Sequence, residues 1–267
     1  MRVSLRMDIL RNAKKVLRRA AFVASLPPLR RWLRGRWEGG KDVPPVGLVR
    51  FGSLRRLTPI STDWGDDRGG PVDRYYIERF LKENQRDIRG RVLEIGDDVY
   101  TRRFGEEGVQ SEILVYNIEE NERAAYVGDL SSAAHIPAET FDCVVMTQTL
   151  QLIYEVRDAI ETLHRILKPG GVVLLTAPGI SQINRRDWES WGDFWCWNFT
   201  ALSLRRLFGE RFPEANVHVQ TNGNVLVAAS FLYGLGRGEL TRAELDHHDP
   251  DYEVLITVRA MKWKAAL

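Results

Sequence analysis

Two apolar runs frame the most regular stretch of the chain, residues 141–178. The runs read CVVM and VVLLT, and their β-branched, two-sided apolar character is typical of strands buried between helix layers. Between them, apolar residues recur at helical spacing, at Val156, Ile160, Leu163 and Leu167. Pro169 cannot continue a helix, so the pattern predicts a helix that ends at Lys168. Gly170 and Gly171 then predict a permissive turn into the second strand.

The same reading of apolar period and turn signals predicts further elements. Strands are expected at 91–95, 142–146, 172–176, 216–220 and 252–258, the last two as a closing pair. Helices are expected over 73–84, after Thr200 and from Asn224. In the first of these helices Asp73 is the expected N-cap, and the buried side carries Ile77, Phe80 and Leu81. Strands that alternate with helices in this way predict an α/β fold.

The charge of the chain is divided unevenly. Residues 1–37 contain eleven Lys and Arg against one Asp, a net +10, so the other 230 residues carry −8 of the total of +2. Over 8–21, apolar positions share one helical face and basic residues the other, and Gly and Pro at 39–45 indicate a linker. We therefore expect a basic amphipathic helical arm and linker at 1–45 and one domain at 46–267. A partly disordered arm or an organelle transit peptide is the alternative.

Cysteine usage and hydropathy narrow the setting. Cys143 lies in a predicted core strand, Cys196 lies in a tryptophan-rich loop, and no CxxC or His-Cys spacing predicts a metal site. This usage favours a reducing, cytoplasmic compartment. No apolar run approaches the ~20 residues that span a bilayer, so residues 1–37 predict peripheral attachment to an anionic membrane surface instead. Nucleic acid is not expected as a partner, because the body is acidic and the basic residues gather in the arm.

Four short motifs carry a family resemblance. They read RVLEIGDD (91–98), VQSE (109–112), VGDL (127–130) and LKPGG (167–171). In this order they resemble the class I S-adenosylmethionine-dependent methyltransferases. That resemblance implies a Rossmann-like, doubly wound sheet of seven strands with the last strand antiparallel. Longer stretches, among them DRGGPVDRYYIERFL and DPDYEVLITVRA, are similar to a bacterial subgroup associated with glycan biosynthesis.

The resemblance also implies a set of residues that bind S-adenosylmethionine. Glu94 orders the loop after the first strand, Gly96 lets the backbone approach the ligand, Glu112 accepts the ribose hydroxyls, and Asp129 contacts adenine beside Leu130. Asp97, in the same loop, and Thr147 and Gln148, past the fourth strand, complete the implied set, which is Glu94, Gly96, Asp97, Glu112, Asp129, Leu130, Thr147 and Gln148. Two alternatives stay open. Glu119 or Glu120 replaces Glu112 if the second strand runs further, and the absence of a second glycine after Gly96 predicts a reshaped loop.

The methyl acceptor is expected at the tryptophan-rich segment 185–200, which holds four of the eight tryptophans. This segment follows the fifth strand at the ligand-binding edge of the sheet, and its aromatic and acidic residues suit a sugar-like or amphipathic acceptor. Trp191, Trp195 and Tyr75 are the candidate acceptor contacts, Tyr75 because it lies in the helix that often borders the cofactor in this family. Core packing is the alternative role for the tryptophans.

Transfer of an activated methyl group depends mainly on alignment, so no catalytic residue is compulsory. His135 and Asp193 are the candidate general bases for a hydroxyl acceptor. The expected function is O-methylation of a glycan, glycolipid or related small acceptor, including lipid-linked ones. A non-catalytic scaffold with the same fold is the alternative, and the missing GxGxxG motif disfavours an NAD-dependent oxidoreductase.

Overall fold

The computed structural model describes residues 44, 46–183 and 194–263. The chain divides into two compact units, residues 1–57 and 58–267. In the first unit, a single 3-10 turn, η1 (Gly52–Leu54), is present among the described residues. All strands and α-helices named below belong to the second unit.

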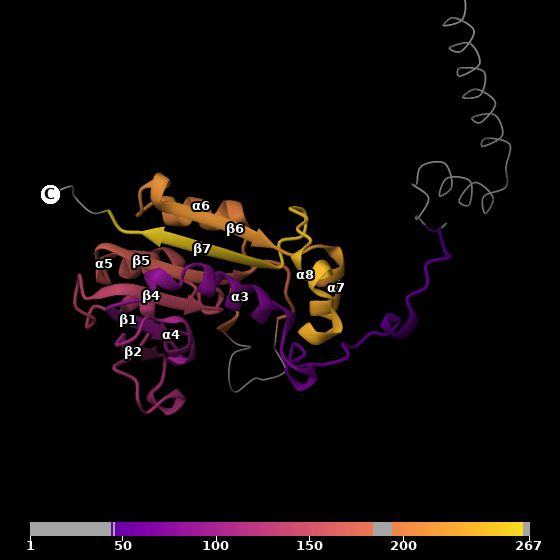
Figure 1. The fold of residues 1–267 in the computed structure, drawn as a ribbon, viewed down its shortest axis with the longest axis horizontal. Coiled ribbons are helices and arrows are strands. Elements are labelled where there is room, and N and C mark those ends of the chain that lie inside the picture. Colours follow the sequence, from indigo (N-terminus) through magenta and orange to yellow (C-terminus); the bar gives the residue numbers. More distant parts are fainter. Residues whose placement is uncertain (1–43, 45, 184–193, 264–267) are drawn as a thin grey trace, which may run out of the picture. The chain divides into compact units, whose positions relative to one another are not determined.

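A seven-stranded sheet organises the second unit (Figure 1). The strand order is β3-β2-β1-β4-β5-β7-β6, and β7 alone runs antiparallel to its neighbours. The strands are β1 (Arg91–Ile95), β2 (Gln110–Val115), β3 (Tyr126–Val127), β4 (Phe141–Thr147), β5 (Leu167–Pro178), β6 (Val217–Asn222) and β7 (Leu255–Met261). The chain has the Rossmann-like methyltransferase fold that the sequence predicts, including the antiparallel last strand.

Helices cover both faces of this sheet. They are α3 (Val72–Glu83), α4 (Val99–Phe104), α5 (Val156–Ile166), α6 (Ala201–Gly209), α7 (Val225–Leu232) and α8 (Arg242–Asp246). Alternate residues of β4 serve two separate cores, since Val144 packs with the helices α5 and α6, whereas Val145 packs with α3 and α7. Burial on both faces is why the central strands are continuous apolar runs.

The turn predicted at Pro169–Gly171 is wrong, because these residues lie inside β5. Helix α5 ends at Ile166, and β5 begins at the next residue. The register with β4 shifts between the pairs Phe141–Leu167 and Cys143–Val172, so the extra residues form a bulge rather than a turn. Gly170 has a φ of 83°, which allows the bulge.

Two boundaries also differ from the sequence prediction. Pro71, not Asp73, is the N-cap of α3, and Asp73 is buried in the first turn. The second strand runs to Val115 instead of ending at Glu112. This second difference changes which acidic side chains lie at the sheet edge.

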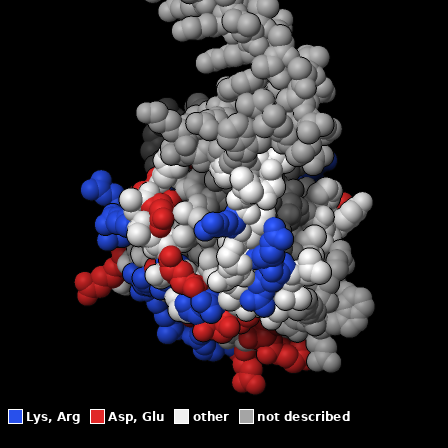
Figure 2. All heavy atoms as spheres, turned by 90° about the vertical axis from the view of Figure 1, so that its right-hand side faces the viewer, with Lys and Arg blue, Asp and Glu red and all other residues white. Residues whose placement is uncertain are grey.

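The face that carries α7 and α8 mixes both signs of charge (Figure 2). Ion pairs join Arg68 to Glu239, and Arg79 and Arg242 to Asp246. Charges of opposite sign on this face are thus paired with one another.

Candidate functional site

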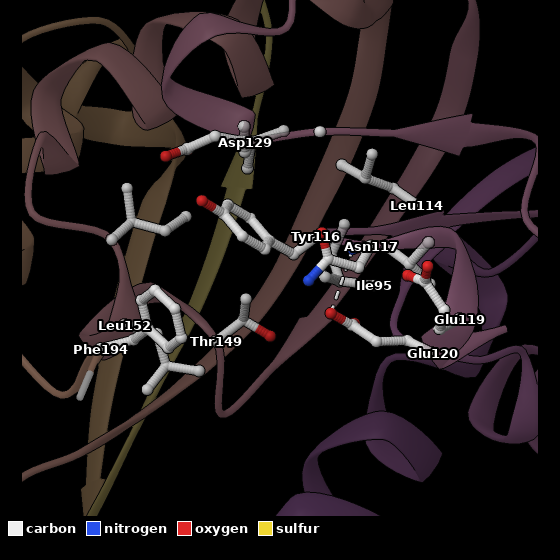
Figure 3. Close-up of a pocket in the computed structure, with 14 residues that line it drawn as sticks. Ile95, Leu114, Tyr116, Asn117, Glu119, Glu120, Asp129, Thr149, Leu152 and Phe194 are labelled. Carbon is white, nitrogen blue, oxygen red and sulfur yellow. Dashed lines mark hydrogen bonds between the residues drawn. The ribbon is translucent and has the colours of Figure 1, made fainter. Parts of the chain in front are cut away.

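A cavity of about 590 Å³ opens at the carboxyl ends of β1, β2, β3 and β4 (Figure 3). Its size lies within the usual range for small-molecule sites, roughly 300–1,000 Å³. The described lining consists of Ile95, Leu114, Val115, Tyr116, Asn117, Glu119, Glu120, Gly128, Asp129, Leu130, Thr149, Leu152, Ile153 and Phe194. Because parallel strands end together at this edge, side chains far apart in sequence converge on one space.

The turn after β1 has room for a ligand beside its backbone. Gly96 has a φ of 90°, and a Cβ at this position would meet no atom within 4 Å. Its N–H donates to the Leu114 carbonyl at 2.8 Å, which fixes the turn against β2. Glycine is therefore required by the backbone, and the open side permits the close approach predicted from sequence.

Glu94 orders this turn from beneath. Its carboxylate accepts the backbone N–H groups of Tyr100 at 3.1 Å and Thr101 at 2.7 Å, and the side chain is buried. Burial raises the pKa of Glu94 to about 7, although the two N–H donors oppose the rise. Since both oxygens are engaged, Glu94 holds the loop between β1 and α4 and does not line the cavity.

The two aspartates that follow Gly96 are turned toward protein partners. Asp97 accepts the Val99 N–H at 3.0 Å, and Asp98 is buried against Arg102 and Arg123 at 2.6 and 3.1 Å. Neither residue belongs to the described cavity lining. Asp97 therefore lies outside the pocket in which the sequence analysis placed it.

The position of Glu112 contradicts its predicted role as the acid at the end of β2. Glu112 lies in mid-strand opposite Leu93, and its carboxylate binds Arg91 at 2.5 and 3.1 Å, below the level of the cavity. The strand continues to Val115, so the edge lies three residues further along the chain.

Three polar residues beyond Val115 occupy the edge instead. Asn117, Glu119 and Glu120 are exposed and line the cavity, and Glu120 accepts the Asn117 N–H at 3.1 Å. Neither Glu119 nor Glu120 forms an ion pair within the described part of the chain. The geometry thus favours Glu119 or Glu120 over Glu112 as the acid at the ligand edge, which is the alternative that the sequence left open.

Asp129 and Leu130 lie where the sequence places them, at the cavity wall after β3. Asp129 also caps the short turn η5 (Leu130–Ser132), accepting the N–H and the hydroxyl of Ser131 at 2.8 Å each. Both of these bonds use one carboxylate oxygen, Oδ1. The capping and lining roles therefore coexist at this residue.

The residues after β4 have a strained backbone. Gln148 has a φ of 48°, rare for a residue with a side chain, and its N–H donates to the Thr176 carbonyl at 3.0 Å. Thr147 and Gln148 are absent from the described lining, whereas Thr149, the next residue, is part of it. The strain carries the chain sharply away from the sheet edge, which shifts the cavity contact by one or two positions.

Only the second half of the tryptophan-rich segment is described. Phe194 lines the cavity and tilts against Tyr116, with ring centroids 5.6 Å apart. Trp195 donates to Asn198, while Trp197 packs against the core and donates to the Ile153 carbonyl at 3.1 Å. Trp191 and Asp193 lie outside the described residues. Core packing thus holds for Trp197, and Phe194 is the aromatic residue at the cavity.

Two other candidates lie elsewhere. The Tyr75 hydroxyl donates to Asp246 at 2.6 Å, so its side chain joins α3 to α8 and does not reach the cavity. His135 packs beside Tyr126, with ring centroids 6.2 Å apart, and is not among the lining residues. Neither position supports the predicted role, which was acceptor contact for Tyr75 and general base for His135.

Sequence reasoning missed Tyr116, Asn117, Thr149 and Phe194. A signal for the first two was present, because the apolar run ILV continues after Glu112 and implies a longer strand. No local signal distinguishes Thr149 or Phe194 from their neighbours. Their roles follow from the strained backbone at Gln148 and from the path of the later loop.

Comparison with known proteins identifies the family. The family described as "Methyltransferase domain" matches residues 73–212, more than half of the 267 residues. The chain belongs to this methyltransferase family.

Solved structures with a similar fold to this methyltransferase are distant in sequence. A SAM-dependent methyltransferase from Archaeoglobus fulgidus is 14% identical over 76% of this chain and 95% of its own, with a TM-score of 0.45. A SAM-dependent methyltransferase from Thermotoga maritima is 17% identical over 70% and 92%, with a TM-score of 0.43. The cyclase SpnF is 16% identical over 70% and 81%, also with a TM-score of 0.43. Among curated proteins, no match is found.

Family membership implies S-adenosylmethionine as the cofactor, and the cavity of this methyltransferase fits that molecule. The described lining contains the carboxylates of Glu119, Glu120 and Asp129 and no Lys, Arg or His. Such a lining suits a ligand that carries a sulfonium cation and a ribose diol. Ile95, Leu114 and other apolar residues supply flat contact for a base, and Gly96 leaves room beside the backbone. Across the described residues, no group of His, Cys, Asp and Glu is arranged to hold a metal ion.

Proposed function

We propose that this chain is a methyltransferase that binds S-adenosylmethionine in the cavity at the carboxyl edge of the sheet and methylates an oxygen of a glycan, glycolipid or related small acceptor. The described lining of the cavity, which is acidic and holds no cation, is the observation that carries the cofactor assignment. The residues that would hold the cofactor are Gly96, Asn117, Glu119, Glu120, Asp129 and Leu130.

The same lining disfavours a dinucleotide such as NAD. A pyrophosphate is anionic and is normally bound by backbone N–H groups at a helix N-terminus behind a glycine-rich turn. Here three carboxylates line the cavity, and Asp97 and Asp98 stand in the loop before α4. Bringing a doubly charged anion into this space would be unfavourable by Coulomb repulsion.

When bound, S-adenosylmethionine supplies an activated methyl group on its sulfonium. The protein's part is then to position the acceptor, and alignment of this kind accounts for much of the rate of such displacements. Phe194 and Tyr116 form an aromatic wall at the cavity, and an aromatic wall suits the apolar face of a sugar or a lipid-linked sugar. We assign no general base, because His135 is not at the cavity and Asp193 lies outside the described residues.

Calorimetric titration of the full chain tests the cofactor assignment. S-adenosylmethionine and its demethylated product should both bind, and NAD should not. Binding of NAD but not of S-adenosylmethionine would overturn the proposal. Absence of binding by all three at millimolar concentration would favour the alternative, a non-catalytic scaffold with a methyltransferase fold.

The acceptor class is tested by transfer of a labelled methyl group. The full chain is incubated with labelled cofactor and with separate pools of lipid-linked glycans, free oligosaccharides, protein and RNA. Label that is attached to the glycans and resists treatment with base would support a methyl ether, that is, methylation at oxygen. Label confined to protein or RNA would contradict the glycan assignment while leaving the methyltransferase assignment intact.

We also propose that the protein attaches to an anionic membrane surface. Residues 1–37 lie outside the described structure, but the adjoining segment 46–57 has the same character. Its apolar side chains Val46, Leu48, Val49, Phe51 and Leu57 are exposed. The segment contains three arginines and no acidic residue. Apolar burial and charge attraction act together at such a surface, with roughly 1 kcal/mol contributed per engaged basic residue.

Vesicle sedimentation tests this attachment. The full chain should sediment with vesicles that contain anionic lipid, and salt should weaken the binding. Leu48→Ala with Phe51→Ala should reduce sedimentation, whereas Leu202→Ala, at an equally exposed leucine of α6, should not. Equal binding by both variants, or by neutral vesicles alone, would contradict the proposal. Among the described residues, no helix combines the length and apolar character that a bilayer span needs.

A further inference from the structure

The loop after β1 (residues 96–98) begins next to Ile95, which lines the cavity, and residues of the loop after β2 (residues 116–125) line the cavity themselves. The first provides the open space at Gly96, and the second carries Asn117, Glu119 and Glu120. A ligand that contacts both loops depends on the distance between them. Any bond that joins the two loops therefore affects how well the cavity is formed before a ligand arrives.

Two contacts join these loops directly. Arg123 of the second loop binds Asp98 of the first through two nitrogens, at 3.1 and 3.4 Å. Asn121 Nδ2 donates to the Gly96 carbonyl at 3.3 Å, and the Asn121 side-chain oxygen accepts the Arg123 N–H at 3.1 Å. Asp98, Asn121 and Arg123 thus form a connected bridge between the two loops.

Asp98, the acid of this bridge, is buried. Only 7% of its side chain is exposed, so its charge needs partners within the protein. Burial by itself would raise the pKa of Asp98, but the hydrogen bonds and charges of Arg102 and Arg123 outweigh it and lower the pKa. Asp98 therefore stays ionised and engaged near neutral pH.

We propose that Asp98, Asn121 and Arg123 act as positioning residues. They hold the loop after β1, which lacks a second glycine, and the loop after β2 at the distance that a bound ligand requires. This interpretation rests on the proposed function, because the cavity it organises is the proposed cofactor site. It also explains why Asp98 can follow Gly96 and Asp97 without obstructing the cavity, since its side chain turns to the arginines.

Arg102 provides a matched control. It also binds Asp98, at 2.6 Å, and its side chain is about as exposed as that of Arg123, 65% against 57%. However, Arg102 lies four residues after Asp98 on α4, so its bond stays within one segment. Removing either arginine takes one cation from Asp98, but only Arg123→Ala removes a contact between the two loops.

The test compares Arg123→Ala with Arg102→Ala in the full chain. Arg123→Ala should raise the Kd for S-adenosylmethionine about tenfold, because part of the binding free energy is then needed to order the loops. Arg102→Ala should change the Kd by less than about twofold. Urea unfolding of both variants should show similar small losses of stability, so a merely structural role predicts equal effects on the Kd.

Hydrogen exchange gives a readout that does not need the ligand. In the unliganded protein, Arg123→Ala should speed exchange at the Gly96 and Asp98 amides, and Arg102→Ala should leave them slow. Equal Kd values and equal exchange in the two variants would overturn the positioning role. If the wild-type chain binds no S-adenosylmethionine, the proposed function fails, and the exchange comparison alone then decides whether the bridge holds the loops.

Discussion

The two edges of the sheet use acidic side chains in opposite ways. Toward the amino ends of the strands, three carboxylates are matched with cations: Glu112 with Arg91, Asp142 with Lys168, and Asp87 with Arg259. At the carboxyl edge the carboxylates of Glu119, Glu120 and Asp129 line a cavity whose described wall holds no cation. A carboxylate that is paired with a cation of the protein interacts only weakly with a ligand, whereas an unpaired carboxylate at a cavity can bind one.

This difference explains the wrong assignment of Glu112. The strand β2 contains one acid, Glu112, and two more, Glu119 and Glu120, follow its end, so the point where the strand ends decides which acid lies at the ligand edge. A strand that ended at Glu112 would place that acid at the ligand edge, but three more residues of pairing with β1 and β3 place it in the paired, amino half. A shift of three residues thus moves an acid from a binding role to a structural one.

The two edges differ most in how the stability of the fold depends on pH, because the sign of this dependence is opposite. Burial without a cation raises the pKa of Glu94 to about 7, above its ordinary 4.5. Its contribution to stability is therefore complete below about pH 4.5 and is lost as the pH rises to about 7. Burial would also raise the pKa of Asp142, but the hydrogen bonds from Lys168 and the Arg91 N–H, together with the charges of Lys168 and Arg89, outweigh burial and lower the pKa. The Asp142 contribution is thus present above the ordinary value of 3.8 and is lost as the pH falls below it.

Urea unfolding between pH 3 and pH 8 measures both signs against Glu94→Gln and Asp142→Asn. Relative to Glu94→Gln, the wild type should lose on the order of 3 kcal/mol between about pH 4.5 and pH 7. Relative to Asp142→Asn, it should lose stability only on acidification. Any constant offset from the glutamine amide does not affect these slopes. Matching slopes for the two variants would remove the contrast between the edges.

Cofactor affinity should depend on the carboxyl-edge acids. Glu119→Gln combined with Glu120→Gln should weaken S-adenosylmethionine binding by roughly 1.5–3 kcal/mol, about ten- to hundredfold, because charge-assisted bonds to the ribose are lost. Glu112→Gln is the matched control and should bind normally. Calorimetry with the three proteins decides the point, and a loss confined to Glu112→Gln would restore the acid predicted from sequence.

The aromatic wall of Phe194 and Tyr116 should contribute less to cofactor affinity than the acids do. Phe194→Ala removes one ring of the wall proposed for the acceptor, and it should also weaken cofactor binding by roughly 0.5–1.5 kcal/mol because this ring lines the cavity proposed for the cofactor. Trp195→Ala, whose ring N–H bonds Asn198 outside the described cavity lining, should leave cofactor affinity unchanged and lower methyl transfer. Calorimetry and labelled methyl transfer separate the two effects. Equal losses of cofactor affinity would mean that both rings support the same packing.

The smallest effect is expected at the amino edge. Glu112→Gln breaks a partly exposed pair with Arg91 and should lower the free energy of unfolding by about 0.2–1 kcal/mol. Urea unfolding at low and high salt measures it, and salt should shrink the difference. A loss of several kcal/mol would show that Glu112 supports more of the sheet than its ion pair.

The sequence by itself determined the fold class, the strands β1, β4 and β5 in outline, the helices α3, α5, α6 and α7, and the closing antiparallel pair. Apolar period, capping residues and proline act over a few neighbouring residues, so they can be read without knowing what lies across the sheet. The position of Gly96 at the end of β1 could be located for the same reason, whereas its part in cofactor binding, like that of Asp129, stays a prediction.

The apolar run after Glu112 indicates a longer strand, but only the tertiary structure decided where β2 leaves the sheet, and with it which acids face the cavity. Continued pairing of Leu114 and Val115 with β3 carries the chain past Glu112, and no local residue pattern encodes that partner. The bulge at Gly170 and the strained backbone at Gln148 likewise depend on neighbouring strands. Pairing across a sheet is a contact between distant segments, so its register fixes the site only after the whole sheet has formed.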